Sequence, residues 1–251
     1  MISTLRNAWR IPDIRKKIIF TLLMLLVIRL GANIPVPYMD KNIIKQIFEA
    51  GEGGLLQFLD LMAGGTLSDF SIFALNIYPY ITSSIIIQLL TIAIPRLEEL
   101  AKEGEEGRKK INRYTRYGTV VLALIQAWGT TFGIFSNALV ADSFIQKAIV
   151  IISLIAGTSF LMWIGDKITE RGVGNGISLI IFIGIVSGLP STIINYIAWA
   201  RLGLVSWIKL VLLAIVAVLI VLVVVALQEG ERKIPVQYAK RVVGRKIYGG
   251  Q

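Results

Sequence analysis

Two aspartates, Asp60 and Asp69, are the acidic residues of an otherwise apolar stretch, residues 53–75. Paired carboxylates can carry out general acid–base catalysis, as in an intramembrane aspartyl protease. Both aspartates lie outside the clear membrane spans, however, and no general-base partner is evident, so the sequence disfavours a protease. The chain has no cysteine and no histidine, which removes thiolate metal sites, cysteine nucleophiles and the commonest general base. We therefore expect no catalytic site, no metal site and no cofactor.

The composition is that of a membrane protein. Of the 251 residues, 55% are hydrophobic and 17% are charged, whereas soluble domains are about 45–50% apolar and about 25% charged. The first 17 residues are basic, but no small-residue cleavage site follows the first apolar run. We interpret that run as a retained span rather than a removed signal peptide.

Six apolar runs are long enough to cross a membrane, judged against the requirement of about 20 residues for a spanning helix. They are Ile18–Ile34, Ser71–Ile94, Tyr117–Phe135, Ala148–Ile164, Ile177–Ala200 and Leu210–Leu227. The last is uninterrupted, whereas the others contain polar or small residues, as do helices that pack against protein or a watery cavity. The predicted fold class is an all-α polytopic membrane protein.

The basic residues predict the orientation of these spans. Most of the 26 lysines and arginines lie before the first run, within residues 96–116 and 167–171, or after the sixth run. The opposite loops hold only Lys41, Lys45, Lys147, Arg201 and Lys209. Because cytoplasmic loops of membrane proteins are enriched in Lys and Arg, both termini and the 96–116 loop are predicted to be cytoplasmic.

Two charged segments have different patterns. The 96–116 loop mixes glutamates with its basic residues, and opposite charges three or four residues apart predict a solvated, partly helical loop. The tail from residue 229 to 251 is basic and has little acid. It is either a solvated tail or a docking surface for an anionic partner such as ribosomal RNA.

The stretch 53–75 is apolar enough for a membrane but is interrupted before it could cross one. Gly64 and Gly65, together with Asp60 and Asp69, break it into short pieces. Non-helical backbone at membrane depth is tolerated only against protein or a water-filled cavity. The glycine pair allows tight packing and a hinge, so we expect a re-entrant segment that can move; the alternative is an amphipathic surface loop.

Arg29 lies late in the first span, just before Pro35 and Pro37, which cannot continue a helix. A charge at membrane depth costs about 2.5–3.5 kcal/mol on insertion scales, so it marks a functional or packing site by default. The alternative is that its side chain extends to the nearby outer surface.

The second span carries isoleucines at helical spacing. Ile77, Ile81 and Ile85 are four residues apart and would line one helical face. Packing or lipid contact would also explain such spacing. The same span contains the polar residues Thr82, Ser83, Ser84 and Gln88.

A glycine-rich turn precedes the fifth span. Gly172, Gly174 and Gly176 alternate with other residues, and Asn175 could cap a helix that begins near Ile177. The G-x-G-x-G pattern is weak evidence for phosphate binding, because nothing here follows a strand.

Five stretches together identify a family. "RLGANIPVP", "SIFALNIYPYITSSIIIQLL", "KEGEEGRKKINRYTRYGT", "GDKITERGVGNGIS" and "YAKRVVGRKIYGGQ" closely resemble, in order, the bacterial SecY family, the pore subunit of the protein-conducting channel. The resemblance implies ten spans in two pseudo-symmetric halves that close like a clamshell around an hourglass pore. This chain would supply the N-terminal half, residues 1–200, plus the sixth span and the start of the next cytoplasmic loop, residues 201–251.

The resemblance also implies residue roles. A re-entrant plug would span about residues 55–67, with the central residues Asp60, Leu61, Met62, Ala63, Gly64 and Gly65. The pore ring would include Ile77, Ile81, Ile177 and Ile181, and the lateral gate Thr82, Ile85 and Gln88. Contacts to the ribosome or motor would come from Arg241, Arg245 and Lys246. Arg29 and Asn175 are kept as structural residues within the membrane.

The implied function is to pass unfolded secretory chains across the bacterial plasma membrane and to release membrane segments sideways into lipid. The implied partners are SecE and SecG, the SecA motor ATPase, the ribosome with its nascent chain, signal peptides, lipid and the C-terminal half of SecY. Half a channel is expected to be inactive alone. The alternative is a small-solute transporter built on inverted repeats, which the absence of paired intramembrane ionisable residues disfavours.

Overall fold

The structure, a computed structural model, describes residues 11–50, 54–141, 143–231, 241–243 and 246–248. The chain forms two compact units, Met1–Ser191 and Thr192–Gln251. The boundary between them falls inside one long helix, Gly176–Arg201.

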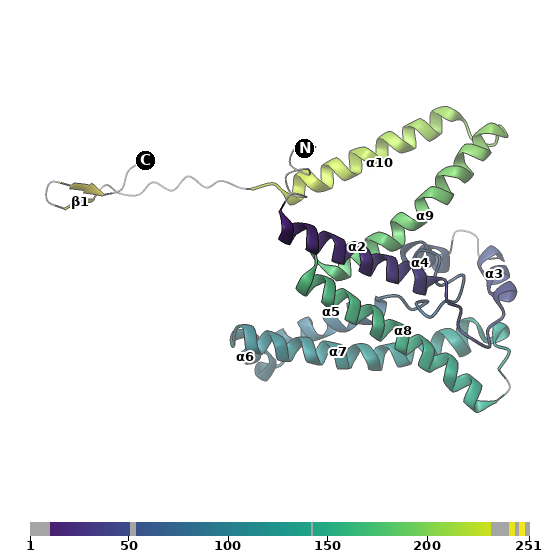
Figure 1. The fold of residues 1–251 in the computed structure, drawn as a ribbon, viewed down its shortest axis with the longest axis horizontal. Helices are drawn as coiled ribbons and strands as arrows, with labels where there is room; N and C mark the ends of the chain where they lie inside the picture. The colour runs from purple at the N-terminus through teal and green to yellow at the C-terminus, as the bar shows by residue number, and fades with distance from the viewer. Residues whose placement is uncertain (1–10, 51–53, 142, 232–240, 244–245, 249–251) are drawn as a thin grey trace. The chain divides into compact units, whose positions relative to one another are not determined.

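The first unit is a helical bundle (Figure 1). Its helices are α2 (Pro12–Ala32), α3 (Lys41–Ala50), α4 (Leu55–Ala63), α5 (Tyr78–Ala93), α6 (Pro95–Lys102), α7 (Glu105–Trp128), α8 (Phe144–Arg171) and the first part of α9 (Gly176–Arg201). The π-helix η1 (Gly129–Ile134) and the 3-10 helix η2 (Ser136–Ala138) follow α7.

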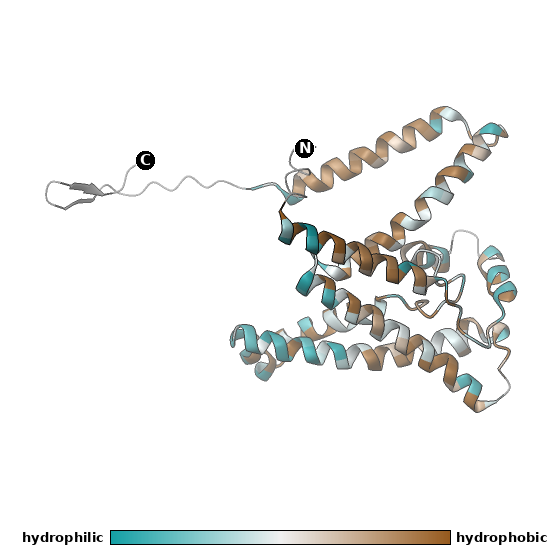
Figure 2. Cartoon of the chain, viewed as in Figure 1, coloured by the Kyte–Doolittle hydropathy of each residue, from teal (hydrophilic) through white to brown (hydrophobic). Residues whose placement is uncertain are grey.

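The second unit holds the end of α9, α10 (Trp207–Gln228) and a small hairpin. Strands β1 (Arg241–Val243) and β2 (Lys246–Tyr248) pair antiparallel. No residue of α10 is buried, and Figure 2 shows apolar residues along its whole length. Such an all-round apolar helix is typical of a membrane span. The predicted helical membrane fold is confirmed, with the hairpin as an addition.

Among the described residues, four helical segments are long and apolar enough to cross a membrane: Glu105–Ile134, Phe144–Arg171, Gly176–Arg201 and Trp207–Gln228. A fifth results if α5 and α6, which meet at a bend of 102°, form one broken span. The predicted first span lies in α2, where Lys16, Lys17 and Arg29 leave only a short uncharged run between them. Crossing by α2, and with it the total of six, therefore remains a prediction.

The predicted second span is wrong at its start. Residues 71–77 are irregular, and helix α5 begins only at Tyr78, with Pro79 in its first turn. Asn76 has a left-handed backbone (φ 48°), and its side-chain Oδ1 accepts a hydrogen bond of 2.8 Å from the N–H of Ile77. Asn tolerates this conformation because its side chain bonds locally. The apolar pattern gave no sign of this interruption.

The irregular segment can lie against α8 because α8 has a glycine there. A Cβ atom at Gly157 would overlap the carbonyl of Ile72. Phe73, the next residue, is buried and stacks on Phe160 of α8, with ring centroids 6.2 Å apart. Residues 71–77 are thereby fixed between the bundle helices.

The charged loop is largely helical, as predicted. Helix α7 begins at Glu105, well before the predicted apolar run, and Figure 2 shows hydrophilic residues over α6 and the start of α7. Exposed ion pairs join Glu98 to Lys102 (2.6 Å), Glu105 to Lys109 (3.3 Å) and Glu103 to Lys110. The hydrogen bond from Lys102 lowers the pKa of Glu98.

Two apolar clusters form the core of the first unit. One surrounds Phe70 and Phe135, whose rings meet edge to face at 5.3 Å, and it includes Ile44 of α3. The other, which we call the isoleucine cluster, joins α2, α5, α8 and α9. Its buried members are Ile28, Ala32, Phe73, Ile77, Leu161, Ile164, Ile168 and Ile180. The candidate site lies beside this second cluster.

Candidate functional site

The predicted plug is a short helix followed by a glycine turn. Helix α4 ends at Ala63, and Gly64 and Gly65 both have positive φ angles, 72° and 84°. The N–H of Gly65 donates to the carbonyl of Asp60 at 3.0 Å, and that of Gly64 donates to Leu61 at 3.2 Å. These bonds satisfy carbonyls that the helix end leaves open, which is the usual role of a left-handed glycine cap.

The prediction that Asp60 breaks this segment is wrong, because Asp60 lies within α4. Only the glycine pair ends the helix. The Oδ1 of Asp60 accepts hydrogen bonds from the backbone N–H groups of Leu67 (3.0 Å) and Ser68 (2.9 Å). Asp60 therefore joins the helix to the turn that follows, a structural role different from the one that the protease alternative required.

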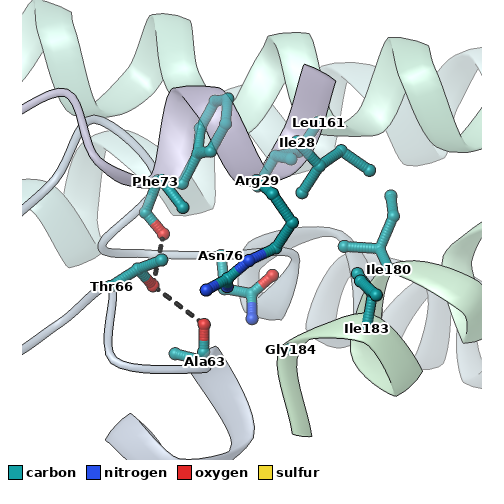
Figure 3. Close-up of a pocket in the computed structure, with 11 residues that line it drawn as sticks. Ile28, Arg29, Ala63, Thr66, Phe73, Asn76, Leu161, Ile180, Ile183 and Gly184 are labelled. Atoms are coloured by element: carbon teal, nitrogen blue, oxygen red, sulfur yellow. Dashed lines mark hydrogen bonds between the residues drawn. The ribbon is translucent and has the colours of Figure 1, made fainter. Parts of the chain in front are cut away.

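A second contact connects the turn to the segment before α5. The hydroxyl of Thr66 lies 3.1 Å from the carbonyl oxygen of Ala63 and 3.2 Å from that of Phe73, as the dashed lines in Figure 3 show. Thr66 is buried. The plug segment is thus held to the bundle at its C-terminal side.

A small cavity of ≈ 20 Å³ separates the end of α4 from the isoleucine cluster. Its lining comes from α2, α4 and the turn after it, the irregular segment, α8 and α9: Ile28, Arg29, Ala32, Ala63, Thr66, Phe73, Asn76, Leu161, Ile180, Ile183 and Gly184. Figure 3 shows the guanidinium of Arg29 pointing into this space, toward Asn76. This placement favours a packing or functional role for Arg29 over extension to the outer surface.

The four predicted ring residues belong to one apolar cluster. Ile77 is buried within the isoleucine cluster, and Ile81, Ile177 and Ile181 pack against it partly buried. Ile77 does not lie on a helical face, since it is the N-cap of α5. The structure brings the four side chains together from two distant parts of the sequence; their role as a pore ring remains a prediction.

The predicted gate residues lie on the exposed side of α5. Thr82, Ile85 and Gln88 are all exposed, with Ile85 at 52%. Ser83, in contrast, is buried, and its hydroxyl donates to the carbonyl of Thr115 on α7 at 2.8 Å. One side of α5 therefore packs on α7, and the other is open to a partner or to lipid.

The expected helix cap at Asn175 is present. Its Oδ1 accepts hydrogen bonds from the N–H groups of Ile177 (2.9 Å) and Ser178 (3.2 Å). The N–H of Gly176 donates to the hydroxyl of Thr169 at 2.9 Å. The first N–H groups of α9 are thus satisfied within the protein, so they offer no anion site.

The predicted contacts to ribosome or motor fall on the hairpin. Arg241 pairs with Tyr248 and Lys246 with Val243 across its two strands, whereas Arg245 lies outside the described residues. The backbone places Arg241 and Lys246 on neighbouring strands, which the sequence pattern did not predict.

One feature of the bundle was not predicted. Arg116 of α7 forms an ion pair of 2.7 Å with Asp166 of α8. Asp166 was visible in the sequence as an acid at the end of an apolar run, a costly place for a charge without a partner. The pair joins the two long helices of the first unit.

Comparison with known proteins agrees with this architecture. The SecY family model matches residues 71–251. The chain is 43% identical over 244 residues to the protein translocase subunit SecY of Buchnera aphidicola subsp. Acyrthosiphon kondoi, covering 95% of this chain and 68% of that protein. It is also 43% identical to SecY of Escherichia coli K12, covering 95% of this chain and 55% of that protein.

A solved structure shares the fold. Sec61 in the canine ribosome–channel complex from the endoplasmic reticulum superposes with a TM-score of 0.62 at 18% identity, over 88% of this chain and 49% of Sec61. Among the curated sequence relatives, the chain spans little more than half the length of most of those it matches. With the family model matching most of its residues and relatives matching nearly all of them, the chain belongs to the SecY family.

Proposed function

We propose that this chain forms the N-terminal half of a channel that passes unfolded secretory chains across the membrane and releases membrane segments sideways into lipid. The observation that supports this most is the position of α4: this short helix ends at a cavity whose other lining residues include members of the isoleucine cluster. A plug beside an apolar constriction needs this juxtaposition.

The proposed closed state uses two barriers. Ile77, Ile81, Ile177 and Ile181 form part of an apolar ring that excludes ions by dewetting, and the segment from Leu55 to Leu67 blocks the pore. Branched aliphatic side chains make no directional bonds that a passing chain would have to break. The chain being translocated would displace the plug and widen the ring, with energy from the ribosome or the SecA motor and no catalytic step in this chain.

The lateral exit would run along the exposed side of α5. Thr82, Ile85 and Gln88 lie there, and a signal sequence could meet both polar and apolar atoms on its way to lipid. The other wall would come from the C-terminal half of SecY.

The proposed setting is the bacterial plasma membrane, with the N-terminus in the cytoplasm. The charge distribution supports this orientation, and bacterial relatives support the location. We propose SecE and SecG as further subunits, and signal peptides, SecA and the ribosome as partners. Canine Sec61, which shares the fold, was solved in a ribosome–channel complex, and Arg241, Arg245 and Lys246 are the residues proposed for such a contact. A small-solute transporter is not favoured, because the relatives are named protein translocase subunits.

The test uses a completed channel, in which residues 1–251 are joined to the part of the E. coli relative that they do not cover. Reconstituted with SecA and ATP, it should protect a secretory precursor from added protease only when the precursor carries its signal sequence. The 251-residue chain alone should give no protection. Protection by the chain alone, or protection without a signal sequence, would contradict the proposal.

A further inference from the structure

The plug segment and α9 touch through two glycines. A Cβ atom built on Gly64 would lie 2.6 Å from the carbonyl oxygen of Gly184 and 2.8 Å from its Cα. In the reverse direction, a Cβ on Gly184 would lie 2.9 Å from the carbonyl oxygen of Met62. Backbone therefore meets backbone at a separation that leaves no room for even a methyl group on either side.

The contact occupies one turn of α9. Ser187 completes it, since its Oγ lies 2.9 Å from the Cβ position of Gly64 and also donates to the carbonyl of Gly184 at 2.6 Å. Gly188, one turn further along, is different, because a Cβ there would meet no heavy atom within 4 Å. The requirement for glycine at Gly184 is thus set by the plug, not by the helix itself.

The same turn borders the cavity at the plug's end. Ile183 and Gly184 from α9 line that cavity together with Ala63 and Thr66 from the plug segment. Figure 3 shows Ala63 and Gly184 on neighbouring ribbons at this point. The plug therefore meets α9 at the residues that follow Ile181, one of the proposed ring residues.

We propose that Gly184 is a positioning residue that sets the closed position of the plug, by allowing the turn at Gly64 to rest directly on α9. This proposal rests on the plug role proposed above. In such a contact the two backbones are held by close van der Waals packing. The plug segment can therefore separate from α9 when a translocating chain enters. Added side-chain volume at Gly184 would push the turn away and favour the displaced plug, because overpacking a tight contact is destabilising.

The position of the plug can be measured directly, because the chain contains no cysteine. The substitutions Ala63→Cys and Ile183→Cys place one thiol on each side of the cavity, in the completed channel with its remaining cysteines replaced. Disulfide formation under mild oxidant then reports docking. Gly184→Val should reduce the rate of cross-linking by about tenfold, the scale that overpacking produces, and Gly184→Ala should have an intermediate effect. Gly188→Val is the matched control and should leave the rate unchanged.

A second pair of variants separates the contact from backbone strain. Gly64 and Gly65 both have positive φ angles, but a Cβ on Gly65 would meet nothing within 4 Å. Gly64→Ala should therefore reduce cross-linking more than Gly65→Ala. Equal rates for Gly184→Val and Gly188→Val, in channels with equal protease resistance, would overturn the proposal.

The resting ion conductance of these channels tests the pore-blocking role of the plug separately from the docking role of Gly184. Gly184→Val should raise the resting conductance, as should removal of residues 58–67, whereas Gly188→Val should not. Cross-linking that is reduced in Gly184→Val, together with a resting conductance that is unchanged both in Gly184→Val and in the deletion, would contradict the plug role and leave the docking contact standing. Reduced cross-linking with raised conductance supports both.

Discussion

The Oδ1 atom of Asp60 accepts a hydrogen bond of 2.9 Å from the backbone N–H of Ser68. A second bond, of 3.0 Å, comes from Leu67 to the same atom. A carboxylate that receives two backbone N–H groups closes the turn that contains both plug glycines. These bonds hold α4 and the following turn together as one unit, which the proposed movement of the plug would require.

Removing the carboxylate should loosen this turn. Asp60→Ala leaves the N–H groups of Leu67 and Ser68 without their acceptor, and a hydrogen bond to a charged group contributes about 1.5–3 kcal/mol. We expect amide hydrogen exchange at Leu67 and Ser68 to accelerate by about tenfold or more, since about 1.4 kcal/mol corresponds to a factor of ten.

Asp60→Asn is the control for this prediction, because it keeps a side-chain oxygen in the same place. It should recover much of the protection that Asp60→Ala loses. Exchange at Leu67 that is equally slow in Asp60→Ala and in the unaltered chain would contradict the role given to Asp60.

Arg29 should favour the docked plug through its charge. Its side chain lines the cavity with Ala63, the last residue of α4, and a cation near a helix C-terminus stabilises it by about 0.3–1 kcal/mol. Arg29→Met should lower the rate of cross-linking between Ala63→Cys and Ile183→Cys by about two- to fivefold. Arg29→Lys, which retains the charge, should have a smaller effect. A rate that rises in Arg29→Met would show that the charge opposes docking.

The orientation in the membrane can be tested by labelling. Ala8→Cys, Glu106→Cys and Lys240→Cys should each react with a membrane-impermeant maleimide only from the cytoplasmic side, because the basic segments that contain them are predicted to lie inside. Lys41→Cys, in an opposite loop, should react only from outside. Labelling of Glu106→Cys from outside would reverse the assigned topology.

A polar substitution at a proposed ring isoleucine should raise the resting conductance, whereas the same substitution at an ordinary residue of a span should not. Ile181→Asn adds a hydrogen-bonding group to the partly buried edge of the isoleucine cluster, where dewetting is proposed to close the pore. The resting conductance of the completed channel should rise severalfold. Val218→Asn, on the exposed surface of α10, should cause no such rise, and an equal rise in both would mean that the isoleucines only pack.

Sequence patterns predicted the long helices well, because a long apolar run in a membrane must satisfy its backbone hydrogen bonds internally and therefore folds as a helix. The runs near Ile177 and Leu210 lie in α9 and α10 as expected, and Asn175 caps α9 through the bonds that its position suggested. The family resemblance also led to four isoleucines, which the fold places in one cluster.

The details that the patterns missed depend on contacts between distant residues. The irregular course of residues 71–77 is possible because Gly157, far along the chain, leaves room for the backbone at Ile72. Asp60 was expected to help break the apolar stretch, yet it lies within α4 and stabilises the turn beyond that helix. The sequence pattern around Gly184 does not predict its contact with the backbone at Gly64. The periodicity of a sequence describes one helix or strand at a time, so it cannot predict contacts between residues of different elements.

The most direct test of the channel is to locate a secretory chain that is arrested during its passage. The completed channel, without other cysteines, carries either Ile181→Cys or, as a control, Ile152→Cys on the exposed surface of α8. A precursor with a single cysteine is stalled by a folded domain at its end, and disulfide cross-links are measured. We expect a signal-sequence-dependent cross-link to Ile181→Cys and none to Ile152→Cys. Cross-linking to Ile152→Cys alone, or equally to both, would contradict a pore lined by the isoleucine cluster.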